Sequence, residues 1–542
     1  MEKGLKNLKI VLWILLSMIV LLVFRLGYIQ LLGHKDLSEV TRMQSMIALK
    51  GSDSRAVILD RNGVALAGNN KKYIYIIKSD MMTSGAEKYL KLLEAGEIDS
   101  GSKQYKVYTS SEYNKDAARK LIDNNKAYIL QASARYSENQ LAEHFIGYVN
   151  KKDASGASGI ELMYDEQLSS LNRKVYAAAD VTGNILQGRG LEITSGDDDD
   201  STVRDSIIVT LDSEIQKAVE EIIDEEDNAC AVVILDAKDG GIVTMASTPG
   251  FDPDNVDKYI SRGTDELLNK VTQGEYPPGS VFKIIVAAAA LENGIESETT
   301  FSCNGYAMAD NMSIKCETGG ETGHGNIDME KAFAHSCNSY FIKLAQQIGA
   351  DNIIKTAEKF GLGNTVLEDF PHECEGAIMN SQQSIGAGVG NLGIGQGETL
   401  TTPLQVAAMT NIIAADGIDV GIKVLMEDVS DKERIVSEET AKMISQMMEQ
   451  TVIDGTAQEL EMTTSEGNAI VAVKTGTAEY NAGSEIRTHA WITGFTPCDD
   501  PEYTITVFVE DGGSGSQTAG PIMKKIVEYL QKSGSYSKPT LA

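Results

Sequence analysis

The stretch Tyr276-Pro277-Pro278-Gly279-Ser280-Val281-Phe282-Lys283-Ile284-Ile285 is the most informative part of this chain. Two prolines and a glycine end an irregular loop, and Val286 with the four alanines after it indicates a helix. Ser280 is therefore expected at or near the N-terminus of that helix. Because Ser280 and Lys283 are three residues apart, they should lie on one helix face.

A serine and a lysine in this arrangement can support nucleophilic catalysis. A hydroxyl is a weak nucleophile until a base accepts its proton, and a lysine can be that base only when burial or a neighbouring cation lowers its pKa. The apolar residues around Lys283 could provide such burial. Taken alone, the pair is more often a capping serine beside a surface lysine.

Two further elements lie downstream: His335-Ser336-Cys337-Asn338-Ser339-Tyr340, and Val473-Lys474-Thr475-Gly476-Thr477-Ala478 at the end of a β-like run. Together with Ser280 and Lys283 they match, in order and spacing, the Ser-x-x-Lys, Ser-x-Asn and Lys-Thr-Gly triplet of penicillin-binding proteins and serine β-lactamases. The chain therefore resembles this group of serine enzymes.

The resemblance covers nearly the whole chain and is most similar to the class B, monofunctional penicillin-binding proteins. The segments that carry it beyond the triplet are Arg55–Gly63, with Ala56 in place of the usual glycine, Gly159–Glu161, Thr210–Asp212 with Ile215 and Gln216, Gly323–Gly325, Gly393–Gly397, Thr402–Gln405 and His489–Trp491. Nothing in the sequence resembles a glycosyltransferase domain.

The resemblance implies a peptidoglycan D,D-transpeptidase that works through a serine acyl-enzyme. Ser280 would attack the carbonyl between the two D-alanines that end a stem peptide, and Lys283 would accept its proton. Ser336 would relay a proton toward the leaving D-Ala amine, and Asn338 would hydrogen-bond the substrate amide and Lys283. An amine from a neighbouring strand would then resolve the acyl-enzyme and form a cross-link.

The resemblance also implies how the substrate is held. Lys474 and Thr475 would bind the terminal carboxylate, and Gly476 would leave space for the substrate alongside the strand. The backbone N–H groups of Ser280 and Thr477 would form an oxyanion hole, in which one donor is commonly worth about 3 kcal/mol.

The predicted fold class is mixed α/β (α+β), with an antiparallel sheet flanked by helices and a helical subdomain. Its strands come from both ends of the second part of the chain: Ile207–Leu211, Cys230–Leu235, Ile242–Ala246, Ala469–Val473, His489–Phe495 and Tyr503–Val509. With the resemblance, the domain prediction is a cytoplasmic tip (1–9), a transmembrane anchor (10–32), an elongated β-rich pedestal similar to a dimerisation domain (33–204), a transpeptidase domain (205–535) and a tail (536–542).

Three lysines in the first nine residues precede an apolar run from Ile10 to Phe24. Residues 26–32 extend this run to spanning length, which predicts a membrane anchor. A cleaved signal peptide is the alternative, although small residues for a cleavage site are missing where the run ends. Since basic ends stay in the cytoplasm, we expect a single-pass cell-membrane protein with an extracytoplasmic catalytic domain.

The net charge of -30, from 48 Lys+Arg against 78 Asp+Glu, opposes a nucleic-acid partner. The resemblance instead implies peptidoglycan stem peptides and β-lactams as ligands. It also implies a membrane-embedded glycosyltransferase of the shape, elongation, division and sporulation type as a partner. No cofactor is predicted.

Six cysteines are too few for a disulfide scaffold. Cys303 and Cys316 could pair in an oxidising exterior, with unpaired thiols as the default. Cys303, Cys316 and His324 match a zinc site by residue type, but no CxxC or HExxH spacing supports one, so no metal is predicted. Cys337 is assigned no chemistry.

The triplet leaves alternative functions open. A D,D-carboxypeptidase, a β-lactam hydrolase and a β-lactam sensor would use the same residues and would differ in the fate of the acyl-enzyme. A non-catalytic scaffold of a cell-wall synthesis complex would tolerate a broken triplet, whereas this one is intact. The same motifs serve elongation, division and sporulation, so the sequence favours none of the three roles.

Overall fold

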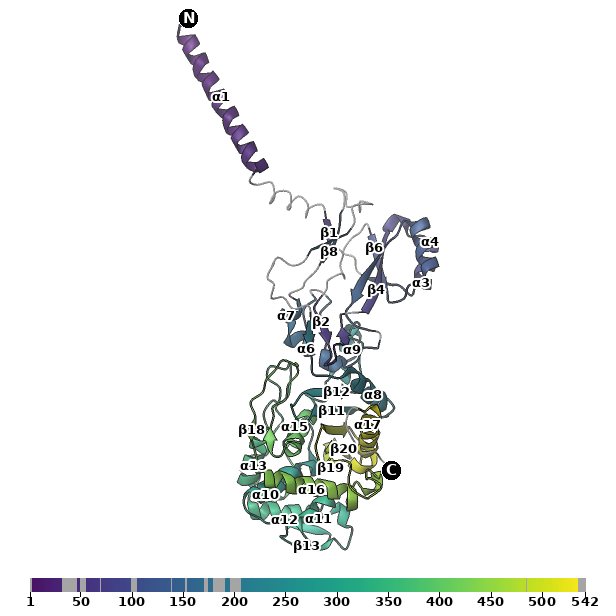
Figure 1. The fold of residues 1–542 in the computed structure, drawn as a ribbon, viewed down its shortest axis with the longest axis vertical. Coiled ribbons are helices and arrows are strands. Elements are labelled where there is room, and N and C mark those ends of the chain that lie inside the picture. The colour runs from purple at the N-terminus through teal and green to yellow at the C-terminus, as the bar shows by residue number, and fades with distance from the viewer. Residues whose placement is uncertain are drawn as a thin grey trace. The chain divides into compact units, whose positions relative to one another are not determined.

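The computed structural model describes residues 2–31, 46–48, 55–68, 70–98, 105–137, 139–151, 154–169, 174–178, 191–194, 206–483 and 485–534 (Figure 1). The predicted tail 536–542 and the predicted boundary at residue 204 lie outside these residues. Contacts divide the chain into unit 1 (Met1–Arg55, Lys71–Ala134 and Ser170–Thr202) and unit 2 (Ala56–Asn70, Arg135–Ser169 and Val203–Ala542). The domain limits given above stay predictions.

Unit 2 is built on a five-stranded antiparallel sheet in the order β12-β11-β21-β20-β19. Its strands are β11 (Cys230–Asp236), β12 (Ile242–Ser247), β19 (Ala472–Ala482), β20 (Glu485–Thr496) and β21 (Tyr503–Val509). Because β11 pairs with β21, the first hairpin and the three last strands form one sheet. This confirms the predicted sheet with strands from both sequence ends, except for the segment Ile207–Leu211, whose strand Ser206–Ile208 pairs with Val57–Leu59 in a separate sheet.

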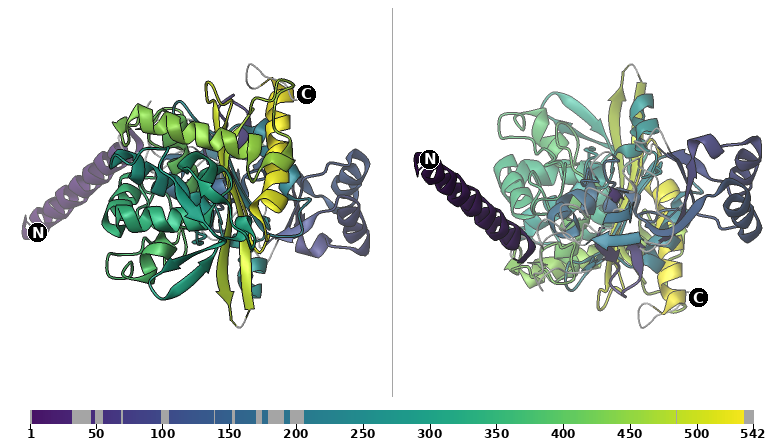
Figure 2. Two further views of the ribbon diagram at one scale, coloured as in Figure 1. Left: turned by 90° about the horizontal axis from the view of Figure 1, so that it is seen from below. Right: turned by 90° about the horizontal axis from the view of Figure 1, so that it is seen from above.

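Helices cover both faces of this sheet, as Figure 2 shows. Helices α8 (Ser213–Ile223) and α17 (Gly520–Ser533) share an apolar core with one face, to which Ile492 of β20 contributes. Side chains alternate along a strand, so Thr493 points to the other face. There it hydrogen-bonds Thr410 of α15 (Pro403–Ala414) through the two hydroxyls, at 2.7 Å.

A helical subdomain adjoins the sheet. Its central helix α10 (Lys283–Glu292) is buried from Ile284 to Ala290, in keeping with a helix that is apolar on every side. The surrounding elements are β13 (Phe301–Cys303), β14 (Tyr306–Ala309), β15 (Met312–Lys315), β16 (Gly325–Ile327), α11 (Met329–Ala334), α12 (Asn338–Ile348), α13 (Ala350–Lys359), α14 (Ala387–Leu392) and α16 (Glu438–Asp454).

The first part of unit 2 consists of short elements. They are β2 (Val57–Leu59), β3 (Ala65–Ala67), α5 (Glu143–Ile146), α6 (Gly159–Met163), α7 (Asp165–Ser169), β10 (Ser206–Ile208) and α9 (Val256–Arg262). The strand predicted at Ile207–Leu211 ends at Ile208, because the Thr210 N–H turns to the Val424 carbonyl at 2.9 Å.

The described residues of unit 1 form two sheets. One is four-stranded in the order β5-β6-β4-β7 and shares an apolar core with helices α3 (Ser84–Leu92) and α4 (Lys115–Asn125), to which Tyr75, Leu90 and Leu121 contribute. The other has the order β1-β8-β9. The elements are β1 (Met46–Ala48), β4 (Asn70–Lys78), α3 (Ser84–Leu92), β5 (Gly96–Ile98), β6 (Tyr105–Ser110), α4 (Lys115–Asn125), β7 (Tyr128–Ala134), β8 (Lys174–Ala178) and β9 (Leu191–Thr194).

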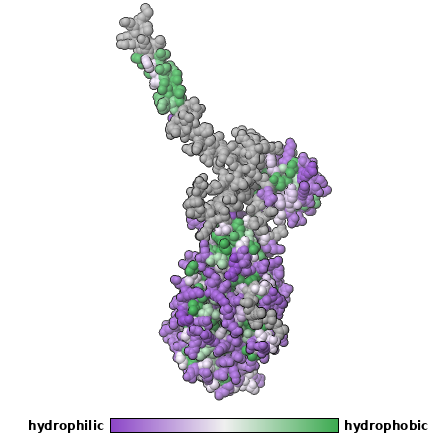
Figure 3. All heavy atoms as spheres, viewed as in Figure 1, coloured by the Kyte–Doolittle hydropathy of each residue, from purple (hydrophilic) through white to green (hydrophobic). Residues whose placement is uncertain are grey.

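Helix α1 (Glu2–Leu31) contains most of the predicted anchor segment. Its large apolar side chains from Ile10 to Phe24 are exposed, and Figure 3 shows them as a green cluster. Among the described residues, no helix has the length and apolar character that crossing a membrane requires.

Candidate active site

Ser280 lies in a 3-10 turn, η3 (Gly279–Phe282), directly before α10. Gly279 has a φ of +55°, and its N–H donates to the Gly395 carbonyl at 2.9 Å. A Cβ at Gly279 would lie 2.7 Å from the Thr477 carbonyl oxygen, so glycine lets this turn approach β19. The predicted place of Ser280 at the start of the helix is confirmed.

Lys283 is the first residue of α10 and is fully buried. Its Nζ donates hydrogen bonds to Ser336 O at 2.8 Å, to Ser336 Oγ at 3.1 Å and to Asn338 Oδ1 at 2.8 Å. Burial lowers the pKa of Lys283 to about 7. A substantial share of this amine is therefore neutral near pH 7, as a general base must be.

Lys474 reaches the same hydroxyl from strand β19. Its buried Nζ donates to Ser336 Oγ at 3.0 Å and to the Thr475 carbonyl at 2.8 Å. Burial, and then the charge of Lys283, lower the pKa of Lys474 well below its usual value. Ser336 Oγ thus joins the two lysines, and its hydroxyl can pass a proton between them.

Ser336 lies in the turn after α11, and Asn338 is the first residue of α12, with Cys337 between them. Ser336 has a φ of +54°, a left-handed conformation that costs free energy in residues other than glycine and is common at functional sites. The Asn338 side chain accepts from Lys283 and donates from Nδ2 to the Lys315 carbonyl at 3.3 Å. These two bonds fix the direction in which the Asn338 amide points.

The residues after Lys474 follow along β19. Thr475 Oγ1 hydrogen-bonds Thr456 Oγ1 at 2.6 Å, and Thr477 Oγ1 accepts from the Gly515 N–H at 3.4 Å. Thr475 is buried, whereas Thr477 is exposed. The two threonines therefore differ in access to solvent.

Gly476 packs closely against η3 and β20. A Cβ there would lie 3.0 Å from Val281 Cγ1 and 3.1 Å from Trp491 Cβ. Protein atoms therefore fill the side of Gly476 on which a Cβ would project, and close packing on that side explains the glycine. Its predicted role in leaving room for the substrate stays a prediction.

A cavity of about 390 Å³ brings six of the eight predicted site residues together, namely Ser280, Ser336, Asn338, Thr475, Gly476 and Thr477. Lys283 and Lys474 do not line it but lie buried behind it and reach it through Ser336. The sequence does not predict the other residues that line the cavity, which are Ser313, Ile314, Lys315, Glu317, Thr318, Ile394, Gln396, Thr456, Glu479, Ser514 and Ser516. Of these, Ile394 and Gln396 belong to the segment Gly393–Gly397, which carries part of the family resemblance.

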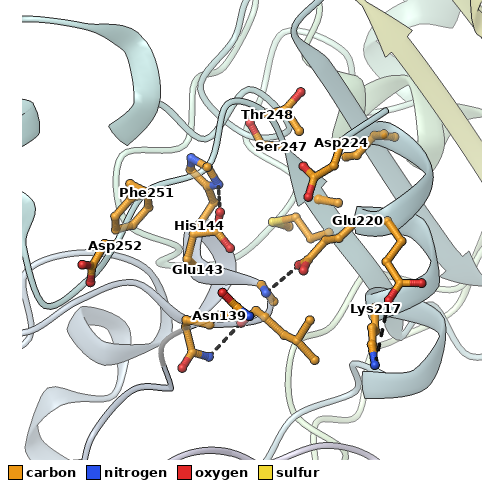
Figure 4. A pocket seen from close by; sticks show the side chains of 18 of the residues that line it. Asn139, Glu143, His144, Lys217, Glu220, Asp224, Ser247, Thr248, Phe251 and Asp252 are labelled. Atoms are coloured by element: carbon orange, nitrogen blue, oxygen red, sulfur yellow. Dashed lines mark hydrogen bonds and ion pairs between the residues drawn. The ribbon is translucent and has the colours of Figure 1, made fainter. Parts of the chain in front are cut away.

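A second, larger pocket of about 620 Å³ lies elsewhere in unit 2 (Figure 4). Burial, and then Glu220, raise the pKa of Glu143 in this pocket to about 8, and burial raises the pKa of Glu220 to about 7. Glu220 accepts from the Ala142 N–H and from the Gln216 amide, each at 2.7 Å. These carboxyl groups are partly protonated at neutral pH, and the pocket contains none of the predicted catalytic residues.

The cysteines are free in the structure, so the alternative of a Cys303–Cys316 disulfide is not realised. In the described part of the chain, one group of side chains can hold a metal ion: Cys303, Cys316, His324 and Cys337, whose ligand atoms lie within 4.8 Å of one another. The first three had been weighed for zinc and set aside. Cys337, to which the sequence assigned no role, completes the group.

The fold and the three motifs gathered around this cavity are those of a penicillin-binding protein transpeptidase domain. Residues 230–528 match the family model of the penicillin-binding protein transpeptidase domain, and residues 52–198 match that of the penicillin-binding protein dimerisation domain. Because the first match covers more than half of the chain, the protein belongs to the penicillin-binding proteins, in their class B, as its motifs indicate.

Curated relatives are similar over long stretches. The peptidoglycan D,D-transpeptidase MrdA of Haemophilus influenzae is 28% identical over 71% of this chain, and the match spans 64% of that relative. The stage V sporulation protein D of Bacillus subtilis is 28% identical over 96% of this chain and 84% of its own length.

Solved structures share the fold. The penicillin-binding protein PBP2 of Helicobacter pylori, at 24% identity, covers 91% of this chain and 100% of its own with a TM-score of 0.69. A complex of PBP2 with MreC from the same organism gives a TM-score of 0.68 over 91% of this chain and 99% of that chain. The mixed α/β transpeptidase fold that the sequence predicted is therefore confirmed.

Proposed function

We propose that this protein is a peptidoglycan D,D-transpeptidase that cross-links stem peptides through an acyl-enzyme on Ser280 and is inhibited by β-lactams. The observation that carries the proposal is the hydroxyl of Ser336, which two buried lysines share at 3.1 and 3.0 Å beside the cavity that contains Ser280. Family membership and the names of the curated relatives support the same activity.

In the first step, neutral Lys283 accepts the proton of Ser280 as the serine oxygen attacks the carbonyl between two D-alanines. The lowered pKa of Lys283 supports this role. As the peptide bond breaks, Ser336 passes a proton from Lys283 to the leaving D-Ala amine. Asn338, oriented by its bond to Lys283, hydrogen-bonds the substrate amide.

Lys474 is suited to hold the carboxylate that ends the donor peptide, together with Thr475. Its pKa is lowered by burial and by Lys283, so an arriving carboxylate would favour its charged form. The backbone N–H groups of Ser280 and Thr477 form the oxyanion hole in this proposal, which is supported by the closeness of η3 to β19.

The acceptor amine of a second stem peptide then attacks the ester carbonyl and releases Ser280. The test is an incubation of the purified full chain with lipid-linked glycan polymer made by a partner glycosyltransferase, followed by mass spectrometry of the digested product. We expect dimers of stem peptides and free D-Ala, and neither product with Ser280→Ala. Release of D-Ala without dimers would instead support a D,D-carboxypeptidase.

We also propose that residues 10–32 anchor the protein in the cell membrane, with the catalytic domain outside. Three lysines before an apolar run support this topology. Fractionation of cells after a carbonate wash tests it: the protein should stay with the membranes, and its recovery in the soluble fraction would contradict the proposal. A matched chain that starts at residue 33 should be soluble.

The proposed partner is a membrane-embedded glycosyltransferase of the shape, elongation, division and sporulation type. No segment of the given sequence resembles a glycosyltransferase domain, and a transpeptidase acts on glycan strands that a polymerase makes. In Helicobacter pylori, PBP2 forms a complex with MreC, and this assembly of a structural neighbour supports a protein partner. Co-purification of the partner with the full chain, but not with the chain from residue 33, is the expected result.

A further inference from the structure

Strand β19 is an edge strand of the five-stranded sheet, and one of its faces borders the cavity that contains Ser280. Because side chains alternate along a strand, Thr475, Thr477 and Glu479 point to the same side. All three line the cavity, whereas Ala478 is buried and does not. Four residues of strand span about 13 Å, so Glu479 lies at the far end of a row that begins at Thr475.

The backbone of β19 is closed to further pairing at Glu479. With its amide oriented so that both polar atoms are satisfied, the side chain of Gln396 donates to the Glu479 carbonyl at 3.2 Å and accepts from the Glu479 N–H at 3.3 Å. Thr477, two residues earlier, turns its N–H and C=O to the same edge of the strand. An incoming peptide can therefore pair with Thr477, but its main chain cannot continue the pairing to Glu479.

The contacts assigned in the proposed function fix the direction of the donor peptide. Its terminal carboxylate is held at Lys474 and Thr475, and the carbonyl that Ser280 attacks accepts from the Thr477 N–H. The peptide then runs antiparallel to β19, so the residue before the two D-alanines lies beside Ala478, one step from Glu479. Diagonal neighbours across a strand pair are within reach of long side chains. A long side chain on that residue of the donor can therefore reach the Glu479 carboxylate.

Glu479 is a carboxylate without a cation in this cavity. The side chain is exposed, and within the described ranges of the chain no lysine, arginine or histidine forms an ion pair with it. Glu317, the other carboxylate in the wall, differs because it lies 4.0 Å from Lys315 Nζ. The cavity thus has a lysine behind one end of the β19 row and an unpaired carboxylate at the other.

We propose that Glu479 binds a side-chain ammonium group of the donor stem peptide, and so selects donors in which the residue before the two D-alanines carries a free amine. This inference rests on the proposed function. A primary amine of this kind is charged at neutral pH, and its hydrogen bonds to a carboxylate are charge-assisted. Glu479 makes and breaks no bond in the reaction; it is a specificity-determining residue.

The test uses two synthetic donors that differ in one group. One is Nα-acetyl-L-Lys-D-Ala-D-Ala with a free ε-amine, and the other is the same peptide with that amine acetylated. The kcat/KM for release of D-Ala reports only the steps up to acylation, so the acceptor does not enter. We expect the full chain to favour the free amine by about three- to tenfold, between the effect of an exposed ion pair and that of a strong charge-assisted hydrogen bond. Equal values, or a preference for the acetylated donor, would overturn the proposal.

Variants assign the preference to one carboxylate. Glu479→Gln keeps the shape of the side chain without its charge and should reduce the preference to less than twofold, and Glu479→Lys should reverse it. Glu485→Gln is the matched control, because Glu485 is an exposed carboxylate at the start of β20 that does not line the cavity. It should keep the preference of the wild type. An undiminished preference in Glu479→Gln, or an equal loss in Glu485→Gln, would overturn the assignment.

Binding to a chain that cannot be acylated separates this inference from the proposed function. In Ser280→Ala, saturation-transfer NMR should show tighter binding of the free-amine donor, and Glu479→Gln in the same background should remove the difference. Equal binding of the two donors to Ser280→Ala would overturn the role of Glu479. The expected difference in binding, together with no release of D-Ala by the wild type from either donor, would support the subsite and count against the proposed function.

Discussion

Removal of the hydroxyl that two lysines share is the sharpest perturbation that this structure offers. In Ser336→Ala, Lys283 Nζ loses its bond to Oγ at 3.1 Å and Lys474 Nζ loses its bond at 3.0 Å. Both amines would stay buried with one partner fewer. The change also removes the one hydroxyl that bonds both lysines among the described residues.

The expected size of the effect follows from these two bonds. A hydrogen bond to a charged group is worth roughly 1.5–3 kcal/mol, and only part of that is gained in the transition state. A group that transfers a proton in the transition state contributes about 10²–10⁴-fold, which is about 3–5 kcal/mol. We therefore expect acylation to slow by about 10²–10³-fold.

The assay is the time course of covalent labelling by a fluorescent penicillin at several concentrations and one pH. Ser336→Gly is the companion variant, because glycine lacks the hydroxyl but adopts the +54° φ without cost. The rate of labelling should be lowered to a similar degree in both Ser336 variants. Ser339→Ala is the control, since within the described ranges its buried hydroxyl bonds the Tyr306 carbonyl alone, at 3.0 Å, and it should label at the normal rate. Labelling of both Ser336 variants within threefold of wild type would refute the proton-relay reasoning.

Three further predictions follow from the same structure. Because burial lowers the pKa of Lys283 to about 7 and the neutral amine is the base, acylation should rise nearly tenfold per pH unit below pH 7 and level off above it, and a flat profile between pH 5.5 and 8.5 would count against this role. Gly476→Ala places a Cβ 3.0 Å from Val281 and should lower the free energy of unfolding by about 1–3 kcal/mol in urea titrations, so an unchanged midpoint would contradict the packing argument. Burial and Glu220 raise the pKa of Glu143 from 4.5 to about 8, so the folded state binds more protons than the unfolded chain and stability should fall as the pH rises from about 4.5 to 8. Glu143→Gln should flatten the fall in Tm between pH 6 and 8, and an equally steep fall would show that another group causes it.

Much of the fold followed from local patterns in the sequence. The turn between β11 and β12 is marked by Asp and Gly residues, and the apolar runs at the C-terminal end predicted β20 and β21. These patterns work because a strand buried in a sheet needs a continuous apolar run. The strand predicted to end at Leu211 stops at Ile208 instead, because the backbone after it bonds to the distant segment around Val424. The sequence around Ile208 does not indicate that this distant segment is its partner.

The candidate site was predictable in its residues but not in its geometry. The three motifs identify Ser280, Ser336 and Lys474 as site residues because the order and spacing of the motifs are distinctive. Both lysines bond Ser336 Oγ, and Ser336 has a left-handed φ. Backbone conformational propensities do not predict this φ for a serine. The sequence suggests only three members of the group Cys303, Cys316, His324 and Cys337, because Cys337 lies between two catalytic residues and its spacing from Cys316 carries no signal.

The assignment of Ser280 as the nucleophile of an acyl-transfer site can be tested by mass spectrometry of the purified chain after reaction with penicillin, first intact and then as peptides. We expect one adduct per chain with the mass of the intact β-lactam, located on Ser280 and absent from Ser280→Ala. An adduct on any other residue, or undiminished adduct formation by Ser280→Ala, would contradict it.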